Sequence, residues 1–221
     1  MVPVIRQSIP LPQKMYQKAR RTATVEDLEV MFPGMIALTN ASEQPILQPK
    51  RSDMEKPHYS AKAKTHTVKV QYTTSFDGLI VHKTSHSPGR RHDYMVYKMK
   101  QPTFPGGLPY KNSGGVGRIA RDHLRHHTDT AYIAMGNAVP GLDYVTPIRR
   151  RPGKDKTPAE RAYNRAHSRV RIRVENATRR VKIFRIMKER YRNRLKKYDV
   201  INDIVCGLVN QAVLLKRDEL L

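Results

Sequence analysis

Acidic residues, cysteine and tryptophan are scarce in this 221-residue chain. It holds 19 Asp and Glu residues against 42 Lys and Arg residues, which gives a formal net charge of +23. A charge of this size and sign favours a polyanionic partner, and we expect that partner to be nucleic acid. Trp is absent and Phe occurs only four times. No expected helix combines a basic face with bulky Leu, Phe or Trp on the other face, which argues against binding to an anionic membrane surface.

The single cysteine, Cys206, excludes an internal disulfide. It lies in an apolar run, so we expect a buried thiol in a reducing compartment. Met1–Gln13 lacks the clustered positive charge and apolar core of a signal peptide. The apolar run Ile204–Leu215 is too short to span a bilayer and contains Asn210 and Gln211. These features predict a soluble cytoplasmic protein with no membrane partner, associated with the nucleoid if the source is bacterial or archaeal.

Signatures of several enzyme classes are also missing. The glycines of 114–117 lack the G-K-[S/T] ending of a phosphate-binding loop. On a helix, His123 and His127 would share a face, but Leu124 stands where a zinc protease needs glutamate. No serine lies in a G-x-S-x-G turn. The sequence therefore argues against a P-loop enzyme, a zinc protease and a serine hydrolase.

Local patterns predict an α/β domain with a mixed sheet flanked by helices. An arm is expected over residues 1–21, one domain over 22–216 and a tail over 217–221. Inside the domain we expect a strand at Met35–Thr39 followed by Asn40, and then a loop over Ala41–Tyr59. The remaining expected elements are a hairpin of Thr65–Thr73 and Leu79–Thr84, a helix at Asp93–Lys100, a helix at Ile119–His127, a strand at Ala131–Met135 and a helix at Tyr198–Lys216.

The most distinctive stretch is Thr157–Lys197, which predicts one long, strongly basic helix. Thr157 and Glu160 form a capping box with proline at the first helical position. Glu175 is an isolated acidic residue in the middle of this helix, with arginine four residues before it and four after it. One interpretation is a solvated face with i,i+4 ion pairs. The other is a carboxylate placed where a phosphate backbone and a metal ion would meet.

Metal-dependent phosphoryl transfer needs carboxylates that converge from different elements. Asp93 and Glu175 are the candidates. The two expected core strands end instead at Asn40 and Gly136. An amide oxygen can coordinate a hard cation, but without the charge that makes binding tight. These residues alone therefore predict a nucleic-acid-binding surface around an incomplete metal site.

A series of motifs along the chain resembles the catalytic region of DDE-type insertion-sequence transposases, the group related to the Harbinger superfamily endonucleases. A D-G-T-E-R-P-I-like motif corresponds to Asn40–Ile46, and a P-G-S-x-H-D motif to Pro88–Asp93. The remaining matches are Thr24–Gly34, Tyr59–Thr67, Thr157–Arg165, Arg169–Glu175, Lys182–Ile186 and Tyr191–Arg194. Together they cover the chain from about Thr22 to Leu215.

The resemblance implies an RNase H-like fold, DNA as partner and Mg²⁺ or Mn²⁺ as cofactor. It also implies a triad of two aspartates and a glutamate, the second aspartate lying in a D-x-G-Y-x-G motif after a later strand. Glu175 matches the glutamate, whereas Asn40 and Gly136 replace the aspartates, with Asp93 as an auxiliary candidate ligand. We therefore expect a transposase-derived protein with impaired or no cleavage activity. The expected DNA-binding residues are Arg165, Arg169, Arg171, Arg179, Lys182, Arg192 and Arg194.

Two alternatives remain open. One is an active transposase that uses Asp93 and Glu175 with an unconventional third ligand. The other is a basic structural protein that binds nucleic acid, such as a ribosome-associated factor. A helix-turn-helix segment of the kind that precedes the domain in this family is not recognisable in the sequence, and homo-oligomerisation is left open.

Overall fold

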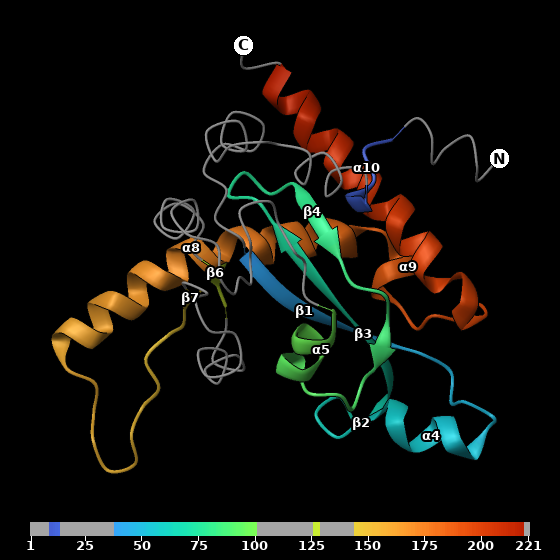
Figure 1. Cartoon of the computed structure of the whole chain (residues 1–221), viewed down its shortest axis with the longest axis horizontal. Coiled ribbons are helices and arrows are strands. Elements are labelled where there is room, and N and C mark those ends of the chain that lie inside the picture. The colour runs from blue at the N-terminus through green and yellow to red at the C-terminus, as the bar shows by residue number, and fades with distance from the viewer. Residues whose placement is uncertain (1–8, 14–37, 101–125, 129–143, 219–221) are drawn as a thin grey trace, which may run out of the picture.

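The structure is a computed structural model that describes residues 9–13, 38–100, 126–128 and 144–218. Figure 1 shows the helices and strands with the labels used below. The helices are α4 (Ser52–His58), α5 (Asp93–Lys100), α8 (Pro158–Ile183), α9 (Arg185–Lys188) and α10 (Tyr198–Asp218), with a 3₁₀ turn η2 at Leu195–Lys197. The strands are β1 (Leu38–Pro45), β2 (Tyr59–Ser60), β3 (Thr65–Thr74), β4 (Ile80–Lys83), β5 (Ser87–Pro88), β6 (His126–His127) and β7 (Tyr144–Val145).

The sheet is mixed, as expected, and β3 is its longest strand. Antiparallel ladders join β3 to β1, β2, β4 and β5. On the edge of β1 away from β3 the pairing is parallel: β1 pairs with β6, and β6 pairs with β7. The order β4-β3-β1-β6-β7 therefore has β3 running opposite to the other four strands. Figure 1 shows α8 crossing one face of this sheet while α5 lies against the other.

The first strand differs from the sequence prediction, which ended it at Thr39 and expected a loop over Ala41–Tyr59. Instead β1 continues through Pro45, and each of its residues pairs with a residue of β3. A short helix, α4, follows it. The polar residues after Asn40 suggested a loop, but Gln44 is buried. Its Nε2 donates to the carbonyls of Ile186 and Glu189 at 2.7 and 2.8 Å. A local hydropathy pattern cannot anticipate partners that lie so far along the chain.

The hairpin, the helix after it and the last helix are confirmed as β3–β4, α5 and α10. The long basic helix begins at its predicted cap, but it ends at Ile183 instead of Lys197. Phe184 is extended, and the chain then returns to the sheet, where the Tyr191 amide donates to the Pro45 carbonyl at 2.8 Å. The predicted end of the helix was wrong because apolar residues recur beyond Ile183, although the backbone leaves the helical conformation at Phe184. His126 and His127 form β6, so they are not the end of a helix.

The core lies between the sheet and the pair α8 and α10. Val68, Val70 and Tyr72 of β3 pack there, together with Ala177 and Val181 of α8 and Val205, Cys206 and Val209 of α10. Burial raises the pKa of the Cys206 thiol well above its ordinary value, so the thiol stays protonated. This agrees with the buried cysteine expected from the sequence.

By length and composition, the segment Leu195–Lys216, which includes most of α10, could cross a membrane, although the run Ile204–Leu215 alone is too short. In the structure, buried polar groups tie it to the sheet. Asn210 accepts from the Ile80 amide at 2.7 Å and donates to the Ile80 carbonyl at 2.9 Å. Asn202 accepts from the Tyr72 hydroxyl at 3.0 Å. These bonds and the apolar contacts make α10 a core helix of this domain.

Part of the expected N-terminal arm also packs on α10. Leu11 is buried, and the Pro10 carbonyl accepts a hydrogen bond from Asn210 Nδ2 at 3.0 Å. A Cβ at Gly207 would come within 2.7 Å of the end of the Ile9 side chain, so a larger residue there would make Ile9 shift. Residues 9–13 therefore contribute to the packed structure.

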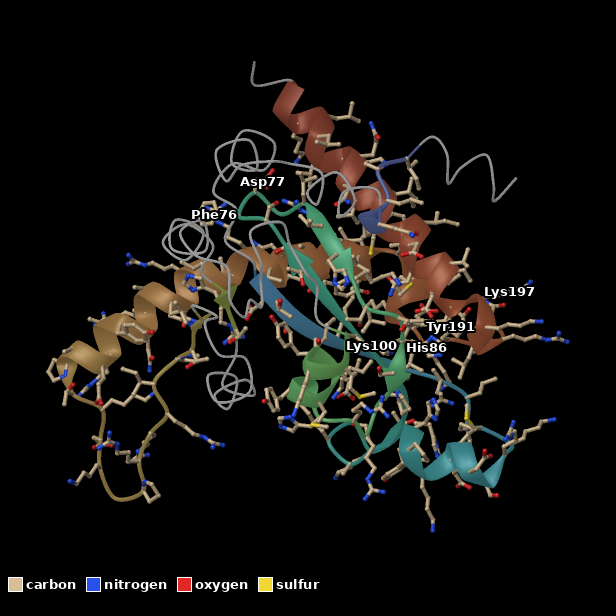
Figure 2. All side chains as sticks on the ribbon, in the orientation of Figure 1. Phe76, Asp77, His86, Lys100, Tyr191 and Lys197 are labelled. Atoms are coloured by element: carbon tan, nitrogen blue, oxygen red, sulfur yellow. The ribbon has the colours of Figure 1, made fainter. Side chains whose placement is uncertain are left out.

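A charged cluster fastens the start of α10 to the end of β4. Asp199 accepts from the His86 amide and from His86 Nδ1, both at 2.8 Å. Lys83 Nζ lies 3.7 Å from Asp199 and 3.3 Å from Asp203. Figure 2 shows His86, Lys100 and Tyr191 gathered at this end of the sheet. Lys100 donates to the His86 carbonyl at 2.9 Å, which closes the cluster from the α5 side.

We expect Asp199→Asn to lower the free energy of unfolding by about 2 kcal/mol at pH 7, because two hydrogen bonds to a carboxylate are weakened. Burial by itself would raise the pKa of Asp199, but the His86 hydrogen bond and the Lys83 charge outweigh it and lower that pKa. The contribution is therefore complete above the ordinary value of 3.8 and is lost as the pH falls through the lowered pKa. Urea unfolding between pH 7 and pH 3 measures it. The exposed Asp155→Asn is the control, and an equal loss in both variants would contradict the expectation.

Candidate functional site

Glu175 lies on α8, and this helix begins after the N-cap residue Thr157. Thr157 Oγ1 accepts from the Glu160 amide at 3.2 Å, and Glu160 accepts from the Thr157 amide at 2.8 Å. The buried side chains of the helix are His167, Val174, Ala177, Thr178 and Val181. Glu175 is next to this buried stripe, so its carboxylate lies at the border between the core and the solvent.

The Glu175 carboxylate is 37% exposed and forms an ion pair with Arg171 at 3.0 Å. Arg171 is one of the two flanking arginines that the sequence singled out. The ion pair occupies Glu175 Oε1, and the other carboxylate oxygen has no hydrogen-bond or ion-pair partner within the described residues. The first interpretation, a helix face with i,i+4 ion pairs, therefore holds for Glu175 and Arg171. The ion pair leaves one carboxylate oxygen of Glu175 for another partner.

Asn40 lies on the same side of the sheet as Glu175. Side chains alternate between the two faces of a strand, so Asn40 shares its face of β1 with Gln44. Gln44 points at α9 through its bonds to the carbonyls of Ile186 and Glu189. Asn40 is also paired with Tyr72, whose side chain packs under α8 and α10. The structure therefore brings these two predicted triad positions, Asn40 and Glu175, to one face.

Asp93 lies on the opposite face. Its carboxylate is 2.6 Å from Nζ of Lys69, and the same nitrogen is 3.1 Å from Glu43. Lys69 is only 7% exposed and alternates along β3 with the core residues Val68 and Val70. The Gln71 side chain donates to the Asp93 carbonyl at 2.6 Å, which also holds the start of α5 to this face. The structure therefore does not bring Asp93 together with Glu175.

The parallel part of the sheet brings β6 beside β1, with His127 paired to Leu38. The His127 and His167 rings are 5.4 Å apart, so β6 contacts α8 directly. The Thr128 amide donates to the Val145 carbonyl at 3.1 Å, which continues the strand pairing for one more residue. Gly136 and the predicted strand at Ala131–Met135 lie outside the described residues.

The residues of the described ranges fit a divalent metal ion poorly. Within those ranges, no group of three or more His, Cys, Asp or Glu side chains is arranged to hold a metal. The candidate ligands on the face that carries Glu175 are its own carboxylate, already paired with Arg171, and the neutral amide of Asn40. A hard cation such as Mg²⁺ binds through oxygen donors and gains most from charged ones. Asp93 cannot add its charge from the other side of the sheet.

Residues 39–210 match the family model of the DDE superfamily endonucleases. This chain belongs to that family. A probable transposase for insertion sequence element IS702 of Microchaete diplosiphon is 30% identical to it over 188 residues, which are 82% of this chain and 58% of that protein. The chain therefore spans little more than half the length of this relative. No solved structure matches the chain.

In this DDE-family chain the expected DNA-binding residues lie mostly at the surface. Arg165, Arg169, Arg179, Arg192 and Arg194 are exposed. Arg171 is partly buried because it pairs with Glu175, and Lys182 is also partly buried. Figure 1 shows the first half of α8 projecting beyond the sheet, and Arg161, Arg165 and Arg169 in this half are exposed.

Other α8 arginines have structural partners that the sequence did not indicate. Arg173 stacks on the Phe76 ring, with Cζ 4.9 Å from its centroid. Figure 2 labels Phe76 and Asp77 at the turn between β3 and β4. Arg180 packs against Gly78 in the same turn, where glycine is required by a φ of +94°. These contacts fix α8 across the hairpin, so these two arginines are structural as well as basic.

The loop before α8 adds basic residues that the sequence analysis left out of the site. A cavity of about 520 Å³ is lined by Lys156, Arg161, Asn164, Arg165 and Ser168. A smaller one of about 140 Å³ lies between the loop and the cap, with Arg149, Arg151 and Lys154 in its wall. The signal was present in the sequence as the basic run Arg149–Lys156. Its position beside Arg161 and Arg165 depends on the chain turning back at Gly153, where φ is +71°.

Proposed function

We propose that this chain is a transposase-derived DNA-binding protein whose domain keeps the acidic helix position of a DDE endonuclease but cleaves DNA poorly. The observation that carries the proposal is the placement of Asn40 and Glu175 on one face of the sheet. An amide replaces a carboxylate at the first position, which removes a negative charge that would hold Mg²⁺ or Mn²⁺.

The RNase H-like fold implied by the motif resemblance is part of this proposal. The strand order β4-β3-β1-β6-β7, with β3 antiparallel to its neighbours, supports it. The long helix α8 on the face that carries Asn40 supports it as well. In an arrangement of this kind, side chains at neighbouring strand positions can converge on a helix that crosses them.

For the second acidic position we propose Asp129 as a stronger candidate than Gly136. The motif resemblance requires an aspartate after a strand, and β6, which pairs with β1, ends at His127. Asp129 follows Thr128 in the sequence and begins Asp129-Thr-Ala-Tyr132, a D-x-A-Y pattern close to D-x-G-Y. Only one of three triad positions would then depart from the family.

DNA is the proposed partner of the exposed face of α8 and of the loop before it. Arg161, Arg165 and Arg169 follow each other at intervals of four residues, so they form one row along the helix. The two cavities beside this row are lined mainly by cationic side chains. Such a row can contact successive phosphates, and the affinity would come chiefly from the release of counterions.

The test replaces Arg161, Arg165 and Arg169 together by alanine and measures binding to a blunt DNA duplex over a range of salt concentrations. We expect the slope of log K against log salt to fall by about 3, because each phosphate contact contributes roughly 0.9. The matched control replaces three exposed lysines elsewhere, Lys98, Lys188 and Lys216. An equal change in both triple variants would show that net charge alone is responsible. Tighter binding of ribosomal RNA than of DNA would favour the structural nucleic-acid-binding alternative.

The alternative of an active enzyme that uses Asp93 finds less support. Asp93 is held by Lys69 on the face away from Glu175, so it would have to leave two strong contacts to join that carboxylate.

A further inference from the structure

A further cavity lies at the other end of the molecule from the projecting half of α8. Its volume is about 570 Å³, and it is enclosed by α4, β2, the start of β3 and the turn after β5. Figure 1 shows α4 and β2 together at this end of the sheet. The lining residues are Ser52, Glu55, Lys56, Tyr59, Ala61, His66 and Arg90. None of the residues assigned to DNA binding or to the triad contributes to it.

The cavity has an aromatic wall whose geometry is set by strand pairing. Tyr59 of β2 is paired with His66 of β3. The two rings are 5.5 Å apart and meet edge to face at 71°. The pairing with His66 orients the tyrosine ring, and Tyr59 remains 45% exposed. An exposed tyrosine held in this way offers a preformed surface for stacking.

Two cations stand beside this aromatic wall. Lys56 lies on α4, and Arg90 lies in the turn after β5. The Gly89 amide donates to the Thr67 carbonyl and the Arg90 amide donates to the Pro57 carbonyl, at 2.9 and 3.1 Å. Any side chain at position 89 would collide with Thr67, so glycine is needed for this close approach. Backbone contacts therefore fix where Arg90 enters the cavity.

The surroundings are also positive. An adjoining cavity of about 300 Å³ shares Lys56 and Arg90 with the first one and adds Arg91. Lys62 and Lys64 are exposed in the turn between β2 and β3. Among the lining residues Glu55 is the acid, and its carboxylate accepts from Gln48 at 2.8 Å. The local field therefore favours an anionic ligand.

We propose that this cavity binds an unpaired nucleotide of a DNA strand, with the base against Tyr59 and the flanking phosphates near Lys56 and Arg90. The volume lies within the range of small-molecule sites, roughly 300–1,000 Å³. A phosphate alone would use the cations but leave the aromatic wall without a role. A base inside a duplex would present its edge to the cavity instead of its face. Stacking on an aromatic ring combined with backbone cations is the usual chemistry of single-strand binding. The inference rests on the proposed DNA-binding function and adds the kind of DNA that this site takes.

The experiment compares two DNA probes that differ in one feature. One is a blunt duplex, and the other is the same duplex with an unpaired tail of five thymidines. We expect the protein to bind the tailed duplex about tenfold more tightly, and Tyr59→Ala to abolish that gain while binding of the blunt duplex is unchanged. Tyr59→Phe keeps the stacking surface and is expected to keep the gain. Arg90→Ala is expected to lower the salt slope for the tailed probe by about 0.7.

The outcomes separate this inference from the proposed function. If neither probe binds, the proposed DNA-binding function fails. If the blunt duplex binds and the tail adds nothing, or if Tyr59→Ala keeps the full gain, the nucleotide site alone is overturned. A control variant with Lys216→Ala, far from the cavity on α10, should retain both the blunt affinity and the tail-dependent gain. Because the readout is a difference between two probes with the same protein sample, partial unfolding of a variant would lower both affinities alike.

Discussion

Asn40→Asp is expected to raise Mn²⁺-dependent nicking of supercoiled plasmid DNA by about a hundredfold. Metal-assisted phosphoryl transfer depends on charged ligands that fix the ion and neutralise developing charge, an effect of several kcal/mol. Position 40 is on the face that carries Glu175, so a carboxylate there would join the one already present. The substitution changes an amide into a carboxylate of nearly the same shape, and the pairing of Asn40 with Tyr72 is made by the backbone.

Two further variants make this prediction specific. Ser42→Asp places a carboxylate on the same face of the same strand, two residues further along. It should bring no gain, because the new charge is displaced by about 7 Å. Adding Glu175→Gln to Asn40→Asp should remove the gained activity. Titration with Mn²⁺ provides a readout independent of cleavage. An unchanged Mn²⁺ affinity in Asn40→Asp would contradict the assignment of position 40, and efficient nicking by the unaltered chain would contradict impaired catalysis.

Lys69→Met is expected to cost about 3–5 kcal/mol of the free energy of unfolding. The lysine is 7% exposed and its ammonium group lies between two carboxylates, 2.6 Å from Asp93 and 3.1 Å from Glu43. It also donates to the Arg91 carbonyl at 2.7 Å. Methionine keeps most of the volume, so the loss would arise from two half-buried carboxylates that face each other without a cation. Urea unfolding at pH 7 measures it.

Whether charge causes this loss of stability can be checked by also neutralising Glu43 and Asp93, the two carboxylates left without a cation. The triple variant Lys69→Met, Glu43→Gln, Asp93→Asn should regain much of the stability, because neutral amides can face each other at lower cost. Lys98→Met, at an exposed position of α5, is the control and should change stability by less than about 0.5 kcal/mol. If the triple variant is as unstable as Lys69→Met alone, packing rather than charge would explain the loss.

Several parts of the fold were predictable because their signals are local. The Thr157 capping box, the Asp77-Gly78 turn between two β-branched runs and the apolar spacing of α10 each depend on neighbouring residues. Glu175 was found in the same way, as an isolated acid in a basic helix. The motif series, from Asn40 to Glu175, also depends only on the order of residues along the chain, and it indicated the family that the comparisons show.

Other features could not be found because their partners are distant. Gln44 is a polar residue that becomes a core residue through carbonyls of Ile186 and Glu189. Asp93 was a candidate ligand in the sequence, yet strand alternation and the buried Lys69 put it on the face away from Glu175. The tyrosine cavity likewise depends on the pairing of Tyr59 with His66 and on the close approach of Gly89 to Thr67.

By itself, the sequence determined the family, the positive field that favours nucleic acid and the helix that carries Glu175. These follow from the kinds of residues present and from their spacing over a few turns. The tertiary structure decided which polar side chains share a face, and so which of them can act together. It did so because the register of β1 on β3, and of β6 on β1, sets the side of the sheet to which each side chain points.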